Sequence, residues 1–388
     1  MSILGFGCMR FPVIDDDYAN INEQESTKLL RHAIDNGVNY VDTAWGYHRG
    51  ASEPFVGKAL RDGYREKVYL ATKMPSWLIE SYDDCEKYLN EQLARLETDH
   101  IDFYLVHSLN KAFWGKVLKA DGLKFLANAL ADGRIGHAGF SFHDYVETFK
   151  TIVDAWDWSF CQIQYNYMDE EYQAGTEGLM YAHNKGMSVI GMEPLRGGKL
   201  TKRIPDEVVE LLSKRGQAHF SKQCGLGNSI GKNVPDPFLA RTPAELGLRW
   251  VWNHPEISVV LSGMNAMEQV EENLRIADEF VPGSMSAQEL DVIEKIKQIY
   301  KERIKYLCTS CRYCLPCPEG VRIPEILNCY NGLMMYRDEE WSKFNYKFEI
   351  KPERRADKCV ECGKCEELCP QGIKIREAMK EAHEKLGE

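Results

Sequence analysis

Three short apolar runs in the first third of the sequence each lead into a side chain that can carry or hold a proton. The runs 38–41, 68–72 and 101–106 end at Asp42, Lys73 and His107, and Tyr47 follows the first of them. Protonation of a carbonyl oxygen while hydride arrives needs a donor whose pKa is near the working pH. A tyrosine hydroxyl has a pKa of about 10, so it needs a neighbouring cation to serve as that donor.

The four side chains have complementary tasks in such a reaction. Tyr47 donates the proton, while Lys73 supplies the cation and is held in place and protonated by Asp42. His107 provides a second hydrogen bond at the substrate oxygen. A single Asp, Lys or His at the end of a strand is usually structural or solvated. Three of them on consecutive strands, with a tyrosine on the following loop, favour a catalytic interpretation.

Short β-branched and aromatic runs alternate with helical patterns along the first 285 residues. Repeated βα units imply a parallel sheet, and eight of them close a (β/α)8 TIM barrel of the α/β class. Catalytic groups in such barrels sit at the rim formed by the carboxyl ends of the strands. Strands are predicted over 4–8, 38–43, 68–73, 101–107, 135–141, 160–166, 187–193 and 257–262, and helices over 24–36, 52–62, 82–97, 122–132, 143–155, 170–185, 243–253 and 265–279.

Local signals add detail to this barrel. Gly37 is expected to end the helix 24–36, because glycine accepts the left-handed conformation that often follows a helix. Ser52 is expected to cap the helix 52–62. The long interval from Pro194 to Thr242 is expected to be a functional loop at the rim. Aromatic residues that follow rim strands are expected to wall a substrate pocket: Trp45, Trp77, Phe113 and Trp114.

Nine of the thirteen cysteines lie between positions 308 and 369. They form a C-x2-C-x2-C-x2-C-P motif and then a C-x2-C-x2-C-x3-C-P motif. The second is the run of bacterial ferredoxins, in which three cysteines bind one [4Fe–4S] cluster and the fourth binds the neighbouring cluster. By that exchange we expect two clusters, one on Cys308, Cys311, Cys314 and Cys369, and the other on Cys317, Cys359, Cys362 and Cys365.

Zinc is the alternative metal, since paired C-x2-C motifs also bind it. Two four-thiolate zinc sites would not need the C-x2-C-x2-C triplet or the trailing Cys-Pro, so the spacing favours clusters. The first motif has two residues where three are usual before its last cysteine, and Cys329 is a weak substitute for Cys317. Helical patterns flank the motifs. We therefore expect a barrel over 1–285, then a linking helix (286–305) and a small α-helical ferredoxin-like domain, together covering 286–388.

The barrel segment resembles the aldo-keto reductases over about residues 3–282, with the motifs in the family's order. The resemblance implies that Asp42, Tyr47, Lys73 and His107 are the catalytic tetrad, with Tyr47 as general acid. The barrel with its cysteine motifs looks like the iron–sulfur branch of that family. The motifs are Gly5-Phe6-Gly7-Cys8-Met9, Asp42-Thr43-Ala44-x-x-Tyr47, Lys73, Leu105-Val106-His107, Gly139-Phe140-Ser141, Gln162-x-x-Tyr165-Asn166, Glu193-Pro194-Leu195 and Glu271-Glu272-Asn273.

The resemblance also implies a nicotinamide cofactor that lies extended across the rim, without a Rossmann domain. Ser141 and Gln162 would hold its carboxamide, and Asn273 would reach its adenine end. The residues implied along the ring, pyrophosphate and ribose are Met192, Pro194, Leu195, Gly197, Gly198, Ser262, Gly263 and Gln269. Met192 stands where many members have an aromatic residue that stacks on the nicotinamide, and Phe142 stands where they have the carboxamide asparagine.

The choice between NADP and NAD stays open. The basic pair that usually holds a 2′-phosphate aligns with Gly263 and Gln269, and a phosphate without a bidentate cation loses its strongest contacts. Arg196 and Lys199 on the long loop are alternative cations.

Composition excludes several other classes of function. The net charge is −11 over 388 residues, which disfavours a nucleic-acid partner. No apolar run is long enough to span a membrane, and no export signal is evident, so a cytoplasmic protein is expected.

We expect an NAD(P)H-dependent reductase of a small-molecule carbonyl compound, with a redox partner protein for the clusters. One alternative is an electron-transfer protein whose barrel binds a nicotinamide or a partner without reducing carbonyls. Another is a reductase whose clusters only brace the C-terminal lobe.

Overall fold

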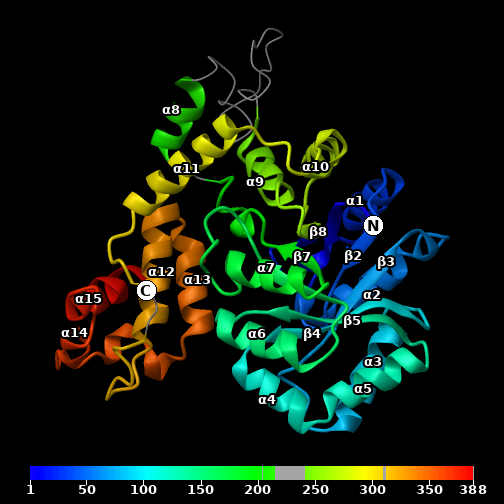
Figure 1. Ribbon diagram of the computed structural model, residues 1–388, viewed down its shortest axis with the longest axis horizontal. Coiled ribbons are helices and arrows are strands. Elements are labelled where there is room, and N and C mark those ends of the chain that lie inside the picture. The colour runs from blue at the N-terminus through cyan, green and yellow to red at the C-terminus, as the bar shows by residue number, and fades with distance from the viewer. Residues whose placement is uncertain (203, 215–240, 309–311, 388) are drawn as a thin grey trace. The chain divides into compact units, whose positions relative to one another are not determined.

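The computed structural model describes residues 1–202, 204–214, 241–308 and 312–387 (Figure 1). Cys311 and residues 215–240 of the predicted rim loop lie outside these residues. The chain divides into two compact units, one of Met1–Gly197 with Glu245–Ser286 and one of Gly198–Ala244 with Ala287–Glu388. The boundary between two folding domains after residue 285 stays a prediction.

The first unit contains a closed barrel of eight parallel strands in sequence order, with the last strand paired to the first. The predicted (β/α)8 barrel is therefore confirmed. The strands are β1 (Leu4–Gly7), β2 (Tyr40–Asp42), β3 (Tyr69–Met74), β4 (Ile101–Leu109), β5 (Ile135–Phe142), β6 (Phe160–Gln164), β7 (Ser188–Met192) and β8 (Ile257–Ser262).

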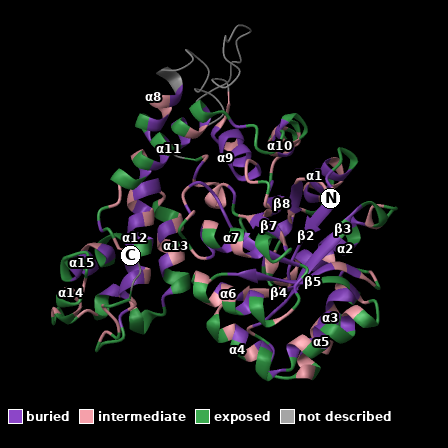
Figure 2. Ribbon diagram, in the orientation of Figure 1, coloured by how far each residue is buried: buried purple, intermediate pink, exposed green. Residues whose placement is uncertain are grey.

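Helices join these strands and cover the outside of the barrel, and their inward faces are buried (Figure 2). The barrel interior is filled by large side chains such as Tyr40, Phe103 and Phe160, so it is a packed core with no pore. The helices are α1 (Glu23–Asp35), α2 (Ser52–Ala59), α3 (Tyr82–Arg95), α4 (Lys111–Lys119), α5 (Gly122–Ala131), α6 (Val146–Ala155), α7 (Gly175–Asn184), α9 (Pro243–Trp252) and α10 (Met267–Glu279).

Two local predictions have opposite outcomes. Gly37 follows α1 with φ of +100°, which confirms it as the residue that ends the helix. Ser52 is not the N-cap of α2, because that position belongs to Ala51 and no side chain caps it. The Ser52 hydroxyl lies instead 2.9 Å from the hydroxyl of Thr43 and 3.3 Å from the carbonyl of Cys8. This serine therefore ties α2 to the loops that follow β1 and β2.

The second unit is helical in its described part, as the cysteine motifs and their flanks predicted. The linking helix expected over 286–305 is α11, and α12 packs against both α13 and α15. No helix in the described part of the chain is long and apolar enough to cross a membrane. The helices are α8 (Asp206–Lys214), α11 (Ala287–Glu302), α12 (Ile323–Tyr336), α13 (Glu339–Glu349), α14 (Lys364–Glu367) and α15 (Ile375–Leu386).

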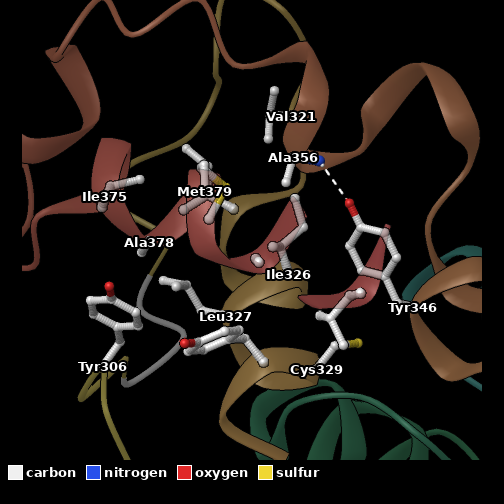
Figure 3. Packing of buried hydrophobic residues seen from close by; sticks show 14 of the residues in the cluster. Tyr306, Val321, Ile326, Leu327, Cys329, Tyr346, Ala356, Ile375, Ala378 and Met379 are labelled. Atoms are coloured by element: carbon white, nitrogen blue, oxygen red, sulfur yellow. Dashed lines mark hydrogen bonds between the residues drawn. The ribbon is translucent and has the colours of Figure 1, made fainter. Parts of the chain in front are cut away.

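An apolar core joins these helices to the cysteine loops. Figure 3 shows Ile326 and Leu327 of α12 packed with Ala378 and Met379 of α15. Tyr346 of α13 belongs to the same core, and its hydroxyl accepts a hydrogen bond of 2.9 Å from the backbone of Ala356. Six cysteines of the two motifs pack against this core at half-buried positions: Cys308, Cys314, Cys317, Cys359, Cys365 and Cys369. The helices thus supply a rigid support for the cysteine loops.

Candidate active site and cluster-binding hollows

Lys73 is the centre of the rim site. Its ammonium group donates hydrogen bonds to Oδ1 of Asp42 at 2.6 Å, to the carbonyl of Thr43 at 2.8 Å and to the hydroxyl of Tyr47 at 3.3 Å. Asp42 is the last residue of β2, and Lys73 lies near the end of the adjacent β3. The barrel therefore brings these three predicted catalytic residues together.

His107 lies at the same rim, near the end of β4. The pairing register between β4 and β5 shifts after Val106, and Ser108 has φ of +52°. This irregularity is a bulge, a feature that commonly redirects a side chain beside an active site. The His107 ring lies edge-on to the Tyr47 ring at 5.9 Å between centroids, and its Nδ1 atom is buried without a partner among the described residues.

Burial dominates the electrostatics of Tyr47. It raises the pKa of Tyr47 to about 12, although the neighbouring Lys73 cation acts to lower that pKa. The sequence-based expectation that Lys73 brings this pKa down towards the working pH is therefore wrong for the free protein, because desolvation outweighs the cation. Tyr47 consequently carries its proton, which is the state that a general acid needs.

The pKa values of Lys73 and His107 are shifted in opposite directions. Burial lowers the pKa of Lys73, but Asp42 and Tyr47 together raise it above its usual value, so Lys73 is a cation. Burial and the nearby positive charge of Lys73 hold the pKa of His107 well below its usual range. His107 is therefore a neutral imidazole that can donate one N–H and accept at the other nitrogen.

Of the aromatic residues predicted to line a substrate pocket, one lies at the site and others pack elsewhere. The Trp77 ring lies 5.2 Å from that of His107, so Trp77 belongs to the site. Trp45 instead packs against Tyr88 and under the Arg95 guanidinium, and Trp114 is buried against Trp158. The expectation that Trp114 walls a pocket is wrong, because it lies in α4, a helix that the sequence pattern did not reveal. Asn110 begins that helix by accepting hydrogen bonds from two backbone N–H groups.

Ser141 and Gln162, which the resemblance placed at the carboxamide, are paired neighbours on β5 and β6. The Ser141 hydroxyl accepts a 2.7 Å hydrogen bond from the backbone of Ser108. The Gln162 amide donates to the sulfur of Met192 at 3.4 Å, and its oxygen is buried with no partner among the described residues. An unpartnered buried acceptor costs free energy unless a ligand supplies a donor. The N–H groups of a nicotinamide carboxamide would fit this atom.

The remaining predicted cofactor residues follow β7 and β8. Pro194 is buried and Leu195 half-buried, and the turn at Gly197 has φ of +66°. Gly198 begins the second compact unit and has φ of +86°. The buried Asn273 of α10 donates to the Ser262 hydroxyl at 2.9 Å, and the Gln269 side chain accepts from the backbone of Asn265. Gln269 therefore stabilises the start of α10.

Arg10 is a candidate that the sequence argument missed. A Cβ atom added to Gly197 would lie 2.9 Å from a guanidinium nitrogen of Arg10, and one added to Gly263 would lie 2.9 Å from its Cδ. The side chain thus lies between the two glycines, and its stem occupies the space that a side chain at position 263 would need. The signal that could have identified Arg10 from the sequence was its position shortly after β1, the first strand that ends at the rim. Arg196, by contrast, pairs with the buried Asp169 at 3.3 Å.

Seven of the eight predicted cluster ligands lie in the described residues, and they line two hollows in the second unit. The first, which we call the Cys359 hollow, has a volume of about 110 Å³, and its cysteines are Cys314, Cys317, Cys359, Cys362 and Cys365. The second, the Cys369 hollow, has a volume of about 20 Å³, and its cysteines are Cys308, Cys314 and Cys369. Cys311, the remaining predicted ligand, lies outside the described residues.

The division of the cysteines between the two hollows agrees with the predicted exchange, in which each motif contributes its fourth cysteine to the cluster of the other motif. Cys369 of the second motif lies with Cys308 of the first, and Cys317 lies with the second motif. Cys314 borders both hollows. Among the described residues, no three Cys, His, Asp or Glu side chains are grouped as ligands of a single metal ion. Each hollow places thiols around a shared space, as the corners of an iron–sulfur cube require.

Cys329 is not part of either hollow. It is buried in α12, where burial raises the pKa of its thiol to about 12. It lies in the apolar core shown in Figure 3 and has the environment of a structural cysteine. Cys8, Cys85 and Cys161 are also buried, which is typical of free cysteines that pack as small apolar side chains.

The sequence matches the aldo/keto reductase family over residues 3–298 and a 4Fe-4S dicluster domain over residues 307–374. Among curated proteins, it is 25% identical to the oxidoreductase YrpG of Bacillus subtilis over 306 residues, which cover 72% of this chain and 88% of that one. It is 27% identical to an NADH-specific methylglyoxal reductase of Escherichia coli over 259 residues, covering 61% of this chain and 78% of that one.

Solved structures show the same barrel. An aldo-keto reductase from Klebsiella pneumoniae in complex with NADPH superimposes with a TM-score of 0.58 at 22% identity, covering 76% of this chain and 90% of that one. The holo form of an aldo-keto reductase from Bacillus halodurans superimposes with a TM-score of 0.59 at 24% identity, covering 76% of this chain and 91% of that one.

Proposed function

Because this chain belongs to the aldo/keto reductase family, we propose that it reduces an aldehyde or ketone with NADH or NADPH and uses Tyr47 as the general acid. The observation that carries the proposal is the position of Lys73, which touches both the Tyr47 hydroxyl and the Asp42 carboxylate at the rim of the barrel. A protonated phenol beside a fixed cation is suited to giving a proton to a carbonyl oxygen.

The chain's own residues account for the movement of the proton. A nicotinamide held by its carboxamide at Ser141 and Gln162 would supply the hydride for the carbonyl carbon. The Tyr47 hydroxyl gives its proton to the carbonyl oxygen, and Lys73 stabilises the phenolate that remains. The neutral His107 donates a second hydrogen bond to the same oxygen, and Trp77 beside it limits access of the substrate.

Three features of the rim fit a nicotinamide dinucleotide. The unpartnered oxygen of Gln162 matches a carboxamide donor. Arg10 supplies a cation for the phosphates between Gly197 and Gly263, because the absence of a side chain at each glycine leaves room for the arginine. Asn273 and Ser262 form a buried polar pair at the end of β8. Because the Arg10 guanidinium lies at Gly197 and only its stem lies on Gly263, its charge serves the pyrophosphate common to NADH and NADPH.

The test is the variant Tyr47→Phe, which removes only the hydroxyl. We expect its kcat/KM for a good carbonyl substrate to fall about 10²- to 10⁴-fold with nucleotide affinity retained, since general acid catalysis contributes factors of that size. Tyr40→Phe is the matched control, because the Tyr40 hydroxyl is buried in the barrel core without a partner among the described residues. Full turnover by Tyr47→Phe would contradict the proposal.

For the second unit we propose two [4Fe–4S] clusters, one in each hollow, that exchange single electrons with a redox partner protein. The grouping of the thiols into two hollows supports this proposal. The ligands would be Cys308, Cys311, Cys314 and Cys369 for one cluster, and Cys317, Cys359, Cys362 and Cys365 for the other.

Clusters that exchange no electrons and only brace this unit are the second candidate, favoured by the packing of the cysteines on its core. Reductive titration of the reconstituted protein separates the two. Redox-active clusters lose absorbance near about 400 nm at the potentials of biological carriers, whereas clusters with only a structural role stay oxidised there.

A further inference from the structure

We propose that Arg376 raises the reduction potential of the cluster in the Cys359 hollow, so that the two clusters of this chain are tuned separately by two arginines. The inference rests on the proposed function, specifically on the placing of one [4Fe–4S] cluster in each hollow. It concerns residues that are neither cysteines nor part of the barrel site.

Arg376 is the second residue of α15 and faces the turn that carries the ligands of the Cys359 hollow. Its guanidinium carbon lies 3.8 Å from the position of a Cβ atom on Gly363, the residue between Cys362 and Cys365 that has φ of +79°. Arg376 is one of the residues that line the hollow. Because Gly363 has no side chain, the cation approaches the ligand turn closely.

An ion pair fixes the direction of this charge. The Arg376 side chain donates two hydrogen bonds to one carboxylate oxygen of Glu366, from Nε at 3.0 Å and from Nη2 at 2.8 Å. The other oxygen of Glu366 accepts from the backbone N–H of Arg376 at 2.8 Å. Glu366 is not among the residues that line the hollow. The pair therefore turns its positive end to the cluster site and its negative end away.

The other charges at this hollow leave Arg376 as the fixed cation. Lys364 and Glu361 also line the hollow, and their charges are opposite. Glu361 is further paired with Lys380 at 2.8 Å. The Arg376 side chain is 49% exposed, so solvent screens part of its charge, but two hydrogen bonds and its place on a helix hold it in position.

A fixed positive charge stabilises the reduced state of a cluster, because reduction adds one electron and makes the cluster more negative. Net charge, hydrogen bonds and solvent exposure are the properties by which proteins set cluster potentials. Arg376 therefore favours the electron on the cluster of the Cys359 hollow.

The Cys369 hollow has its own arginine, Arg312, which corresponds to Arg376 at the Cys359 hollow. Arg312 lines the Cys369 hollow and lies 3.4 Å from Glu325, a residue that also binds Arg322. Arg312 and Arg376 are therefore matched in type and in placement, each at one hollow. Arg312→Gln should lower the potential of the second cluster and leave the first unchanged.

The experiment is a dithionite titration of the full-length, iron-reconstituted protein, followed by electron paramagnetic resonance. In Arg376→Gln we expect one midpoint potential to fall by about 59 mV or more, a tenfold change in a one-electron equilibrium constant, while the other stays constant. Glu366→Gln should raise the same midpoint, because it removes the negative end of the pair. A loosened turn would instead move both variants in the same direction, since each breaks the ion pair.

The possible results distinguish a failure of this inference from a failure of the two-cluster proposal. No shift in Arg376→Gln, a shift of both midpoints, or a fall in Glu366→Gln would overturn the inference. A wild-type protein that binds iron for only one cluster would overturn the two-cluster proposal, and the inference would survive only if Arg376→Gln still lowered that cluster's midpoint. Iron content and absorbance of each variant show that its clusters are intact.

Discussion

Lys73 and Asp42 form an ion pair that is almost completely removed from solvent, with their side chains 0% and 3% exposed and 2.6 Å between Nζ and Oδ1. A buried pair of this kind costs desolvation energy and contributes little net stability, but removing one partner leaves an uncompensated charge. The function of this ion pair is therefore to hold the Lys73 cation in a fixed position beside Tyr47.

Lys73→Met should destabilise the protein by about 3–5 kcal/mol, because the Asp42 carboxylate is left buried and unpaired. The double variant Asp42→Asn with Lys73→Met should recover part of this loss, since no charge remains. Urea unfolding followed by circular dichroism measures both. Equal stability of the single variant and the wild type would show that Asp42 is not held as a charged partner.

Stability should fall as the pH is lowered because of His107. Burial and the nearby Lys73 cation hold the pKa of His107 well below its usual range, and its Nδ1 atom is buried. Below about pH 6.5 the unfolded chain binds a proton at this histidine that the folded chain does not. This contribution is fully present above pH 6.5 and decreases below it.

His107→Gln should therefore lose less stability than the wild type on acidification. Urea unfolding at pH 7 and at pH 5 provides the comparison. Parallel losses of stability in the two proteins would mean that His107 titrates normally in the folded state.

Arg10→Met should weaken NADH and NADPH by the same factor, about tenfold or more, because a charge-assisted hydrogen bond to phosphate is lost. Fluorescence titration of bound nucleotide measures both affinities. Arg61→Gln is the control, since Arg61 is an exposed arginine bound to Glu97 on the outside of the barrel. Selective loss of NADPH would place the Arg10 contact at the 2′-phosphate.

Cys369→Ala should remove the iron of one cluster and leave the other, although Cys369 belongs to the second motif. The iron content should fall from about eight to about four atoms per chain. Cys329→Ala should keep all of the iron, because Cys329 lies in the apolar core away from both hollows. Iron analysis after anaerobic reconstitution tests both, and iron loss in Cys329→Ala would contradict the proposed ligand sets.

Sequence periodicity was sufficient to predict the barrel and the meeting of Asp42, Lys73 and His107 at one rim. Strand direction and the side-chain period of two determine that arrangement, and both can be read from the chain. The grouping of cysteines from two motifs followed from their spacing together with the ligand exchange of the bacterial ferredoxin run that it matches.

Three properties depended on tertiary structure and could not be predicted. The pKa of Tyr47 is set by burial, which no local pattern reports. Arg10 follows β1 and reaches Gly197 and Gly263, which follow the neighbouring strands β7 and β8 but are distant in the sequence. The helix α4 was not predicted, so its Trp114 was expected at the rim, whereas it is buried.

The most direct test of the proposed function is an anaerobic mixing experiment with the reconstituted protein and either NADH or NADPH. Absorbance at 340 nm reports the nicotinamide, and absorbance near 400 nm reports the clusters. We predict that the signal at 340 nm decays only after a carbonyl compound is added, that Tyr47→Phe slows this decay about 10²- to 10⁴-fold, and that the clusters are not bleached. Bleaching of the clusters by nucleotide alone, with no turnover of carbonyl compounds, would contradict the account and identify an electron-transfer protein.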